Sequence, residues 1–384
     1  MKTIGFDAKR IVRNGTGLGS YSRTLVNSLS ALPCDMQLRL YTPDMGRDDL
    51  RQQIEMRQGV EFVYPTNIPL QSKGLIARVR RDWWRTRGIV KDLQRDGIGI
   101  YHGLSGELPV GLKKAGIKGV VTIHDLIFLR HPEYYHPWDV AIYRHKFHAT
   151  LREACRVVAI SECTKRDILA YGDFPEDHID LIYQSCGTRF KVRCTEEKKQ
   201  EVKERYNLPE RFILNVGTIE ERKNAFLAVN ALQHLPQDVA LVIVGRTTPY
   251  AEKVIKPYIK KNKLEERVII LHGIPNEDLP AIYQRAECFV YPSRYEGFGI
   301  PIIEAVQSQL PVIAATGSCL EEAGGPDNLY VSPDDDQGMA NAILHSMKGA
   351  EGRKQRIENS IQYVQRFENS NVAQQMLDLY TNLL

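Results

Sequence analysis

The chain has 384 residues, of which 43% are hydrophobic and 26% charged, and its formal net charge is +4. These values are ordinary for a soluble globular protein, and the length suits two domains. The mild charge argues against a nucleic-acid partner, which needs a concentrated basic face. The seven cysteines form no Cys-x-x-Cys pair, so we expect neither a disulfide framework nor a zinc site.

The N-terminus does not resemble a signal peptide, because Met1 to Asp7 run directly into a strand-like stretch. No window approaches the roughly 18 uninterrupted apolar residues that span a bilayer. We therefore expect a cytoplasmic protein.

Short apolar runs alternate with amphipathic stretches along the whole chain. We predict strands at residues 4–6, 38–41, 98–102, 119–124, 157–161, 179–183, 212–216, 240–244, 268–272, 288–291 and 312–314. Many of these runs are apolar at successive positions, which is typical of parallel strands covered on both faces. The alternation of strands with helices predicts an α/β fold with parallel sheets.

The rhythm breaks after residue 183, where a Ser-Cys-Gly-Thr run precedes a Glu-Glu-Lys-Lys run. We interpret this break as a linker between two Rossmann-like domains. The predicted parts are an N-terminal domain at residues 1–185, a linker at 186–203, a C-terminal domain at 204–366 and a last helix within 367–384. That helix carries one apolar stripe, so we expect it to pack back on the first domain.

The first predicted strand is followed by a glycine-rich loop that contains Gly17 and Gly19. In open parallel sheets, ligands bind beyond the carboxyl ends of the strands. The loop is not the dinucleotide pattern Gly-x-Gly-x-x-Gly, because residue 20 is Ser. By itself it is a weak signal for a phosphate site.

The basic segment from Arg78 to Arg95 contains Trp83 and Trp84. One interpretation is an amphipathic helix at the protein surface. The other is a peripheral contact with the inner membrane surface, where Trp lies at the interface and cations face anionic headgroups.

His124 ends the predicted strand at residues 119–124. A lone histidine is more often a hydrogen-bonded structural residue than a functional one. Its place at a strand exit favours a role in the site.

The segment from Gly217 to Asn224 follows another predicted strand and carries Arg222 and Lys223, and Gly245 follows the next strand. The two cations can clamp a diphosphate. The alternative is a solvated cluster in which Glu220 and Glu221 neutralise them.

The most informative segment is the run Glu-Gly-Phe-Gly-Ile-Pro-Ile-Ile-Glu from Glu296 to Glu304. Its glycines let the backbone approach a ligand, and Pro301 suits the first residue of a helix whose positive end favours phosphate. The two carboxylates are suited to accept hydrogen bonds from sugar hydroxyls, including both hydroxyls of a ribose diol. For an isolated Glu, a surface position would be the simpler interpretation.

This run resembles the Glu-x7-Glu signature of retaining glycosyltransferases of family 4, the group 1 transferases. Thr122-Ile123-His124-Asp125, the Gly217–Asn224 segment and a Ser-Pro-Asp-Asp run at 332–335 occur in the same order as in that family. The resemblance implies the GT-B fold, in which two Rossmann-like domains with parallel sheets face each other across a cleft. The first domain binds the acceptor, the second binds the donor, and the C-terminal helix crosses back to the first domain.

The resemblance also implies roles. Glu304 resembles the carboxylate that binds the ribose, Glu296 the one near the transferred sugar, Arg222 and Lys223 the diphosphate clamp, and His124 the first-domain residue near the donor sugar. Four of these, His124, Glu296, Arg222 and Lys223, are the expected catalytic residues. The remaining expected donor contacts are Gly17, Gly19, Gly217, Gly245, Ile274, Gly297, Phe298, Gly299, Ile300 and Pro301.

We expect no metal and no cofactor, because the cations and the helix end can stabilise the leaving diphosphate. The segment that ends at Asn224 resembles bacterial polysaccharide mannosyltransferases, so the predicted donor is GDP-mannose, with a UDP-sugar as the second choice. The predicted acceptor is a glycan or a lipid-linked glycan. The alternatives are an NAD-dependent oxidoreductase, a nucleotide-sugar epimerase or hydrolase, and a non-catalytic nucleotide-sugar binding protein.

Overall fold

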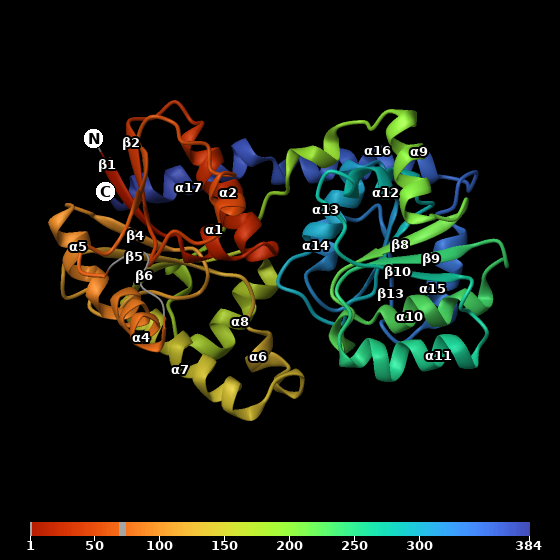
Figure 1. Cartoon of the computed structure of the whole chain (residues 1–384), viewed down its shortest axis with the longest axis horizontal. Helices are drawn as coiled ribbons and strands as arrows, with labels where there is room; N and C mark the ends of the chain where they lie inside the picture. Colours follow the sequence, from red (N-terminus) through yellow and green to blue (C-terminus); the bar gives the residue numbers. More distant parts are fainter. Residues whose placement is uncertain (1, 69–73) are drawn as a thin grey trace. The chain divides into compact units, whose positions relative to one another are not determined.

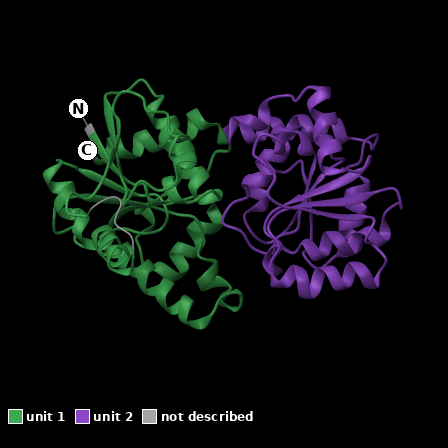
Figure 2. Cartoon of the chain, in the orientation of Figure 1, with its two compact units in different colours: residues 1–186, 367–384 green, residues 187–366 purple. Residues whose placement is uncertain are grey.

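The computed structural model describes residues 2–68 and 74–384. The chain forms two compact units (Figure 2). Unit 1 comprises Met1–Cys186 with Phe367–Leu384, and unit 2 comprises Gly187–Arg366. Each unit contains one sheet, and every strand pairing in the described part of the chain is parallel (Figure 1). The predicted α/β class with two parallel sheets is therefore confirmed.

The sheet of unit 1 has seven strands in the order β3-β2-β1-β4-β5-β6-β7. Their bounds are β1 Lys2–Asp7, β2 Met36–Tyr41, β3 Val60–Val63, β4 Ile100–Gly103, β5 Lys118–Ile123, β6 Ala154–Ala159 and β7 Ile179–Leu181. The order reverses direction between β1 and β4, which is where ligands bind in sheets of this kind.

The helices of unit 1 connect these strands. They are α1 Lys9–Arg13, α2 Gly17–Ser30, α3 Asp48–Arg51, α4 Leu75–Trp83, α5 Ile89–Arg95, α6 Ile127–Arg130, α7 Pro137–Glu153, α8 Glu162–Gly172 and, at the end of the chain, α17 Asn369–Leu383. A π-helical turn at Trp84–Gly88 separates α4 from α5.

Helices cover both faces of this sheet. Successive side chains of a strand point to opposite faces and therefore enter different cores. Val120 and Val158 contribute to a core shared with α1, α2 and α17. Val121 and Val157 contribute to the opposite core, shared with α5, α7 and α8. Double coverage explains why these strands are apolar at successive positions.

The sheet of unit 2 has six strands in the order β10-β9-β8-β11-β12-β13. Their bounds are β8 Phe212–Val216, β9 Ala240–Val244, β10 Val268–Leu271, β11 Phe289–Tyr291, β12 Val312–Ala315 and β13 Leu329–Val331. The helices are α9 Glu196–Tyr206, α10 Ala225–Ala231, α11 Lys256–Lys261, α12 Leu279–Arg285, α13 Ile300–Gln307, α14 Leu320–Gly324, α15 Asp336–Leu344 and α16 Arg353–Val364. As in unit 1, helices cover both faces of the sheet (Figure 1).

Two edge strands, β3 and β13, were not predicted. Each is short, with four and three residues. Such short runs carry too little periodicity to be distinguished from loops.

The segment at 186–203, predicted as a linker, is folded into unit 2 from Gly187 onward. It contains a 3-10 turn at Thr188–Lys191 and most of α9. Phe190 is fully buried, with its ring 5.3 Å from that of Tyr283. The composition of the segment suggested a connection, but this aromatic anchor makes it part of the domain.

The C-terminal helix α17 belongs to unit 1 and packs against α2, as its apolar stripe indicated. Met376 and Tyr380 are fully buried. The Tyr380 hydroxyl lies 2.5 Å from Nδ1 of His102, whose Nε2 lies 2.8 Å from the Thr122 hydroxyl. A polar contact inside the core thus fixes the helix on the sheet.

This packing predicts that Met376→Ala lowers the free energy of unfolding by about 2–5 kcal/mol, because it leaves a cavity in a closed core. Gln375→Ala, one residue earlier on the exposed side of α17, should change it by less than about 0.5 kcal/mol. Urea unfolding of both variants measures the difference. Equal effects would show that α17 is not docked in solution.

Candidate functional site

In unit 2, the predicted donor loops converge on one edge of the sheet. Strands β9, β8 and β11 are neighbours and parallel. Their carboxyl ends therefore meet at the same edge, where Gly217 follows β8, Gly245 follows β9, and Glu296 lies in the loop after β11.

Arg222, Lys223 and Glu296 form one ion cluster. Arg222 is also paired with Glu220 at 2.8 Å, so the alternative of neutralisation by Glu220 holds for this cation. Nζ of Lys223 is 2.6 Å from Oε1 of Glu296, and the Arg222 guanidinium is 3.0 Å from Oε2 of the same carboxylate. The three side chains are only 12–20% exposed. The Tyr291 hydroxyl also contacts the cluster, 3.1 Å from both Lys223 and Glu296.

The cluster is electrostatically coupled. Burial alone would raise the pKa of Glu296, but the charges of Lys223 and Arg222 overcome it and lower that pKa to about 2. Burial would likewise lower the pKa of Lys223, yet the nearby Glu296 carboxylate raises it. All three groups are therefore charged at neutral pH.

The backbone holds these loops close together. A Cβ on Gly245 would lie 1.8 Å from the Gly217 carbonyl oxygen, so only glycine fits there. The backbone N–H of Arg294 donates to the Arg222 carbonyl at 2.8 Å. Asn224 occupies the N-cap position of α10, but its side-chain amide makes no capping bond and instead donates to the carbonyls of Pro292 and Pro333.

Helix α13 begins at Ile300, directly after the glycine-rich loop, and Pro301 is its second residue rather than its first. Gly299 has φ +151°, a conformation that side-chain-bearing residues rarely adopt. The buried thiol of Cys319 donates to the carbonyl of Phe298 at 2.7 Å and to that of Glu296 at 3.1 Å. Gly297 lies between these two anchored residues, so the loop has a fixed shape.

Glu304 lies about one turn inside α13 and is 13% exposed. The Tyr283 hydroxyl donates to its carboxylate at 3.1 Å, and Arg189 is 4.0 Å away. Burial raises the pKa of Glu304 to about 7, although Arg189 and the Tyr283 hydrogen bond act in the opposite direction. Its carboxylate is thus close to its titration midpoint at neutral pH.

In unit 1, both ring nitrogens of His124 are hydrogen-bonded. Nε2 donates to the Leu104 carbonyl at 2.8 Å, and the Gln184 amide lies 2.7 Å from Nδ1. Burial lowers the pKa of His124 to about 4. The ring is therefore neutral, with its proton fixed on Nε2, and is suited to positioning rather than to proton transfer.

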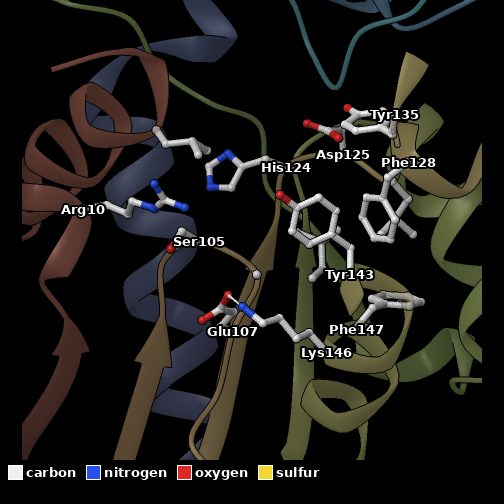
Figure 3. Close-up of a pocket in the computed structure, with 14 residues that line it drawn as sticks. Arg10, Ser105, Glu107, His124, Asp125, Phe128, Tyr135, Tyr143, Lys146 and Phe147 are labelled. Carbon is white, nitrogen blue, oxygen red and sulfur yellow. Dashed lines mark hydrogen bonds and ion pairs between the residues drawn. The ribbon is translucent and has the colours of Figure 1, made fainter. Parts of the chain in front are cut away.

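His124 lines a cavity of about 270 Å³ within unit 1 (Figure 3). Aromatic side chains form one part of the lining, including Phe128 and Tyr143, whose rings meet edge to face at 5.5 Å. The Lys146 ammonium, 3.2 Å from Glu107, lies in another part. A cavity with an apolar wall and a few polar groups is typical of a small-molecule site.

Three other predicted donor contacts are Gly17, Gly19 and Ile274. Gly17 and Gly19 are not in a loop but in the first turn of α2. Gly19 lies against the chain, because a Cβ there would be 1.8 Å from the Asn14 carbonyl oxygen. Ile274 follows the edge strand β10 and is half-buried.

The structure adds residues that the motifs did not indicate. Tyr291 contacts the ion cluster, and Tyr283 and Arg189 contact Glu304. Tyr291 stands next to the motif and could have been included. Arg189 could not, because it lies in the segment that was predicted as a linker.

Within residues 2–68 and 74–384, no group of three or more His, Cys, Asp or Glu side chains is arranged to hold a metal ion. Within the same ranges no helix is both long enough and apolar enough to cross a bilayer.

Comparison with known proteins gives two family matches. Residues 15–185 match the family model "Glycosyltransferase Family 4", and residues 196–363 match "Glycosyl transferases group 1". Among individual proteins, the chain is 29% identical over 378 residues to the O-antigen chain mannosyltransferase B of Escherichia coli, covering 95% of this chain and 96% of that protein. It is 27% identical to the O-antigen chain mannosyltransferase RfbU of Salmonella typhimurium, over 66% of this chain and 67% of RfbU.

Among solved structures, the crystal structure of HepE from Anabaena in complex with UDP and glucose aligns over the full length of both chains. The TM-score is 0.73 at 16% sequence identity, which indicates a shared fold.

The two family models together span both units, and the two parallel sheets match the fold of these transferases. The chain is therefore a glycosyltransferase with the GT-B fold and belongs to family 4, the group 1 transferases.

Proposed function

We propose that this glycosyltransferase moves a hexose from a nucleoside diphosphate sugar to a glycan acceptor, with retention at the anomeric carbon and without a metal. The observation that carries the proposal is the buried cluster of Arg222, Lys223 and Glu296 at the sheet edge of unit 2. Its carboxylate, Glu296, lies in the connection from β11 to α13, and Glu304 lies in α13 itself.

The leaving group of such a reaction is a nucleoside diphosphate, which gains negative charge as the glycosidic bond breaks. Arg222 and Lys223 are fixed cations in a largely water-excluded place, where they stabilise such charge more than in water. The N-terminal end of α13 adds a positive dipole. Lys223 also contacts the Tyr291 ring face, 5.5 Å from its centroid, so its position is defined before a ligand binds.

The environment of Glu304 suits a carboxylate that binds the ribose of the nucleotide. A largely buried carboxylate with one hydroxyl donor keeps acceptor capacity for two further hydroxyl groups. Ionisation is needed for this, and the pKa of about 7 makes the ionised form accessible at neutral pH.

Retention without a protein nucleophile is supported by the state of Glu296. Both of its oxygens contact cations, one Lys223 and the other Arg222. A carboxylate stabilised in this way, with a pKa of about 2, is a weak nucleophile. We propose a front-face route in which Glu296 holds the clamp in place and His124 contacts the donor sugar as a neutral ring.

We propose GDP-mannose as the donor, because the similar proteins from Escherichia coli and Salmonella are both named mannosyltransferases. A UDP-sugar is the second choice, supported by the UDP complex of HepE. The acceptor is proposed to be a glycan or lipid-linked glycan of polysaccharide biosynthesis. It would bind in the aromatic cavity beside His124, since aromatic faces and charged groups suit the two sides of a sugar ring.

We place the reaction in the cytoplasm. None of the seven cysteines, all of which lie within the described residues, forms a disulfide, and Cys163, Cys186, Cys288 and Cys319 are buried. Cysteines that stay reduced are typical of a reducing compartment.

The donor assignment predicts that GDP raises the midpoint of thermal unfolding by several degrees at about 100 times its Kd. UDP and ADP at the same concentration should give smaller shifts. Differential scanning fluorimetry measures all three nucleotides. A larger shift with UDP would replace GDP-mannose by a UDP-sugar.

The clamp predicts that Lys223→Ala lowers kcat about 10²–10³-fold, because one fixed donor to the developing charge is lost. Lys261→Ala, which removes an exposed lysine from α11, should leave kcat unchanged. Single-turnover transfer measures the chemical step, with thermal unfolding as the folding control. Chelation with EDTA should have little effect; unchanged turnover in Lys223→Ala, or loss of activity with EDTA, would contradict the metal-free clamp.

The ribose role predicts a pH-dependent nucleotide affinity. Because the carboxylate of Glu304 must be ionised and its pKa is about 7, its contribution is present above pH 7 and is lost as the pH falls. Between pH 8 and pH 6 this amounts to about a tenfold loss of affinity.

Glu304→Gln is the matched control, because it leaves the titration of the nucleotide phosphate in both measurements. Isothermal titration calorimetry at the two pH values should show the extra tenfold change in the native protein only. The same pH dependence in both proteins would exclude Glu304 from the nucleotide site.

A further inference from the structure

Helix α4 in unit 1 exposes an unusual number of large apolar side chains. Leu75 is 75% exposed, Ile76 73%, Val79 59% and Trp83 58%. At 100° per residue these four fall within an arc of about 100°, so they form one continuous stripe. We call this set the α4 stripe. A clustered apolar surface of this kind marks an interaction site more often than single exposed residues do.

The opposite side of the helix is the side that packs on the protein. Ala77 is 7% exposed and Trp84, in the following π turn, 5%. Arg85 on that side is paired with Asp7 at 2.7 Å and also with Glu107. The helix is thus anchored through one face, and the α4 stripe is directed away from it.

Cations surround the α4 stripe. Arg78, Arg80, Arg87 and Lys91 are exposed, and within the described ranges none of them has an ion-pair partner. By contrast, Arg85, which faces the core, is fully paired. The unpaired charge is therefore confined to the side that faces outward.

Two of these cations line a cavity of about 310 Å³ next to the stripe. Arg80, Lys91 and Trp83 contribute to its wall, with residues 65–68 on another side. Its one carboxylate, Asp92, already accepts a hydrogen bond from the Trp84 indole at 2.7 Å. Two cations and an aromatic ring at the edge of an apolar stripe suit an anionic headgroup above a hydrocarbon layer.

We propose that α4 is a docking surface for a bilayer containing anionic phospholipid. The α4 stripe enters the interface with Trp83 at headgroup depth, Arg78 and Arg87 face the lipid phosphates, and one headgroup occupies the cavity between Arg80 and Lys91. The surface holds the transferase at the membrane as a peripheral protein, where a lipid-linked acceptor would be concentrated.

The charge around the α4 stripe favours an anionic bilayer over a second copy of the chain as its partner. A symmetric contact would place the same stripe and the same cations on both sides. The unpaired arginines would then oppose one another across a buried apolar contact, which is unfavourable. An anionic bilayer satisfies the apolar and the cationic parts together.

The proposal does not depend on the donor assignment, because bilayer binding needs no nucleotide. The experiment uses the full chain and two sets of vesicles, phosphatidylcholine alone and phosphatidylcholine with 30% phosphatidylglycerol. Flotation measures the bound fraction at low and high salt. The thermal shift with GDP or UDP is recorded on every variant as a separate measure of the nucleotide site.

We expect binding to the anionic vesicles only. Salt should weaken this binding, because it screens the attraction between the arginine and lysine side chains and the anionic headgroups. Trp83→Ala should reduce the partition coefficient about tenfold or more, and Arg80→Gln with Lys91→Gln about 25-fold, at about fivefold for each cation. Trp138→Ala is the matched control, since Trp138 is a 76% exposed tryptophan on α7. It should leave binding unchanged, and all variants should keep the nucleotide shift.

Three results would overturn the proposal. The first is no binding of the native protein to anionic vesicles. The second is an equal loss in Trp138→Ala and Trp83→Ala. The third is a change of oligomeric state in Trp83→Ala, measured by light scattering without vesicles, which would assign the stripe to a second copy of the chain.

Discussion

The site in unit 2 depends on one carboxylate held between two cations. Arg222 and Lys223 are adjacent in the chain and largely buried, so without Glu296 their repulsion and desolvation would oppose folding. With Glu296 between them, the loop after β8 and the loop after β11 are joined by charge as well as by the backbone bond from Arg294 to Arg222. These contacts fix the three side chains within the protein, so under the proposed function little further ordering is needed when a diphosphate binds.

The two carboxylates of the Glu-x7-Glu segment lie in different environments. Glu296 and Glu304 belong to one short segment, yet cations lower the pKa of the first to about 2, while burial raises that of the second to about 7. Glu296 is a permanent anion that contacts both cations. The other can change its charge in the physiological range, so it can respond to a ligand that offers hydroxyl groups. Environment, rather than residue type, makes this difference.

The sequence was sufficient for the fold class, because runs of successive apolar residues indicated parallel strands. It also singled out Arg222, Lys223 and Glu296 as candidate site residues, without predicting that Glu296 pairs with the two cations. It was not sufficient for features that depend on tertiary contacts. Phe190 packs beside Tyr283. Its segment therefore belongs to the domain, although its composition resembles that of a linker. Gly19 reads as a loop residue, but the Asn14 carbonyl that excludes a side chain there lies in the chain before α2. The pairing of His124 with Leu104 and Gln184 also needed the structure, because the partners are 20 and 60 residues away.

We propose that the cations of unit 2 hold a nucleoside diphosphate while Glu304 binds its ribose. A crystal structure of the chain with bound GDP, or with UDP if UDP binds more tightly, tests both contacts together. We expect phosphate oxygens within hydrogen-bond distance of Lys223 or Arg222, and both ribose hydroxyls on the Glu304 carboxylate. A nucleotide bound away from these three side chains would contradict it.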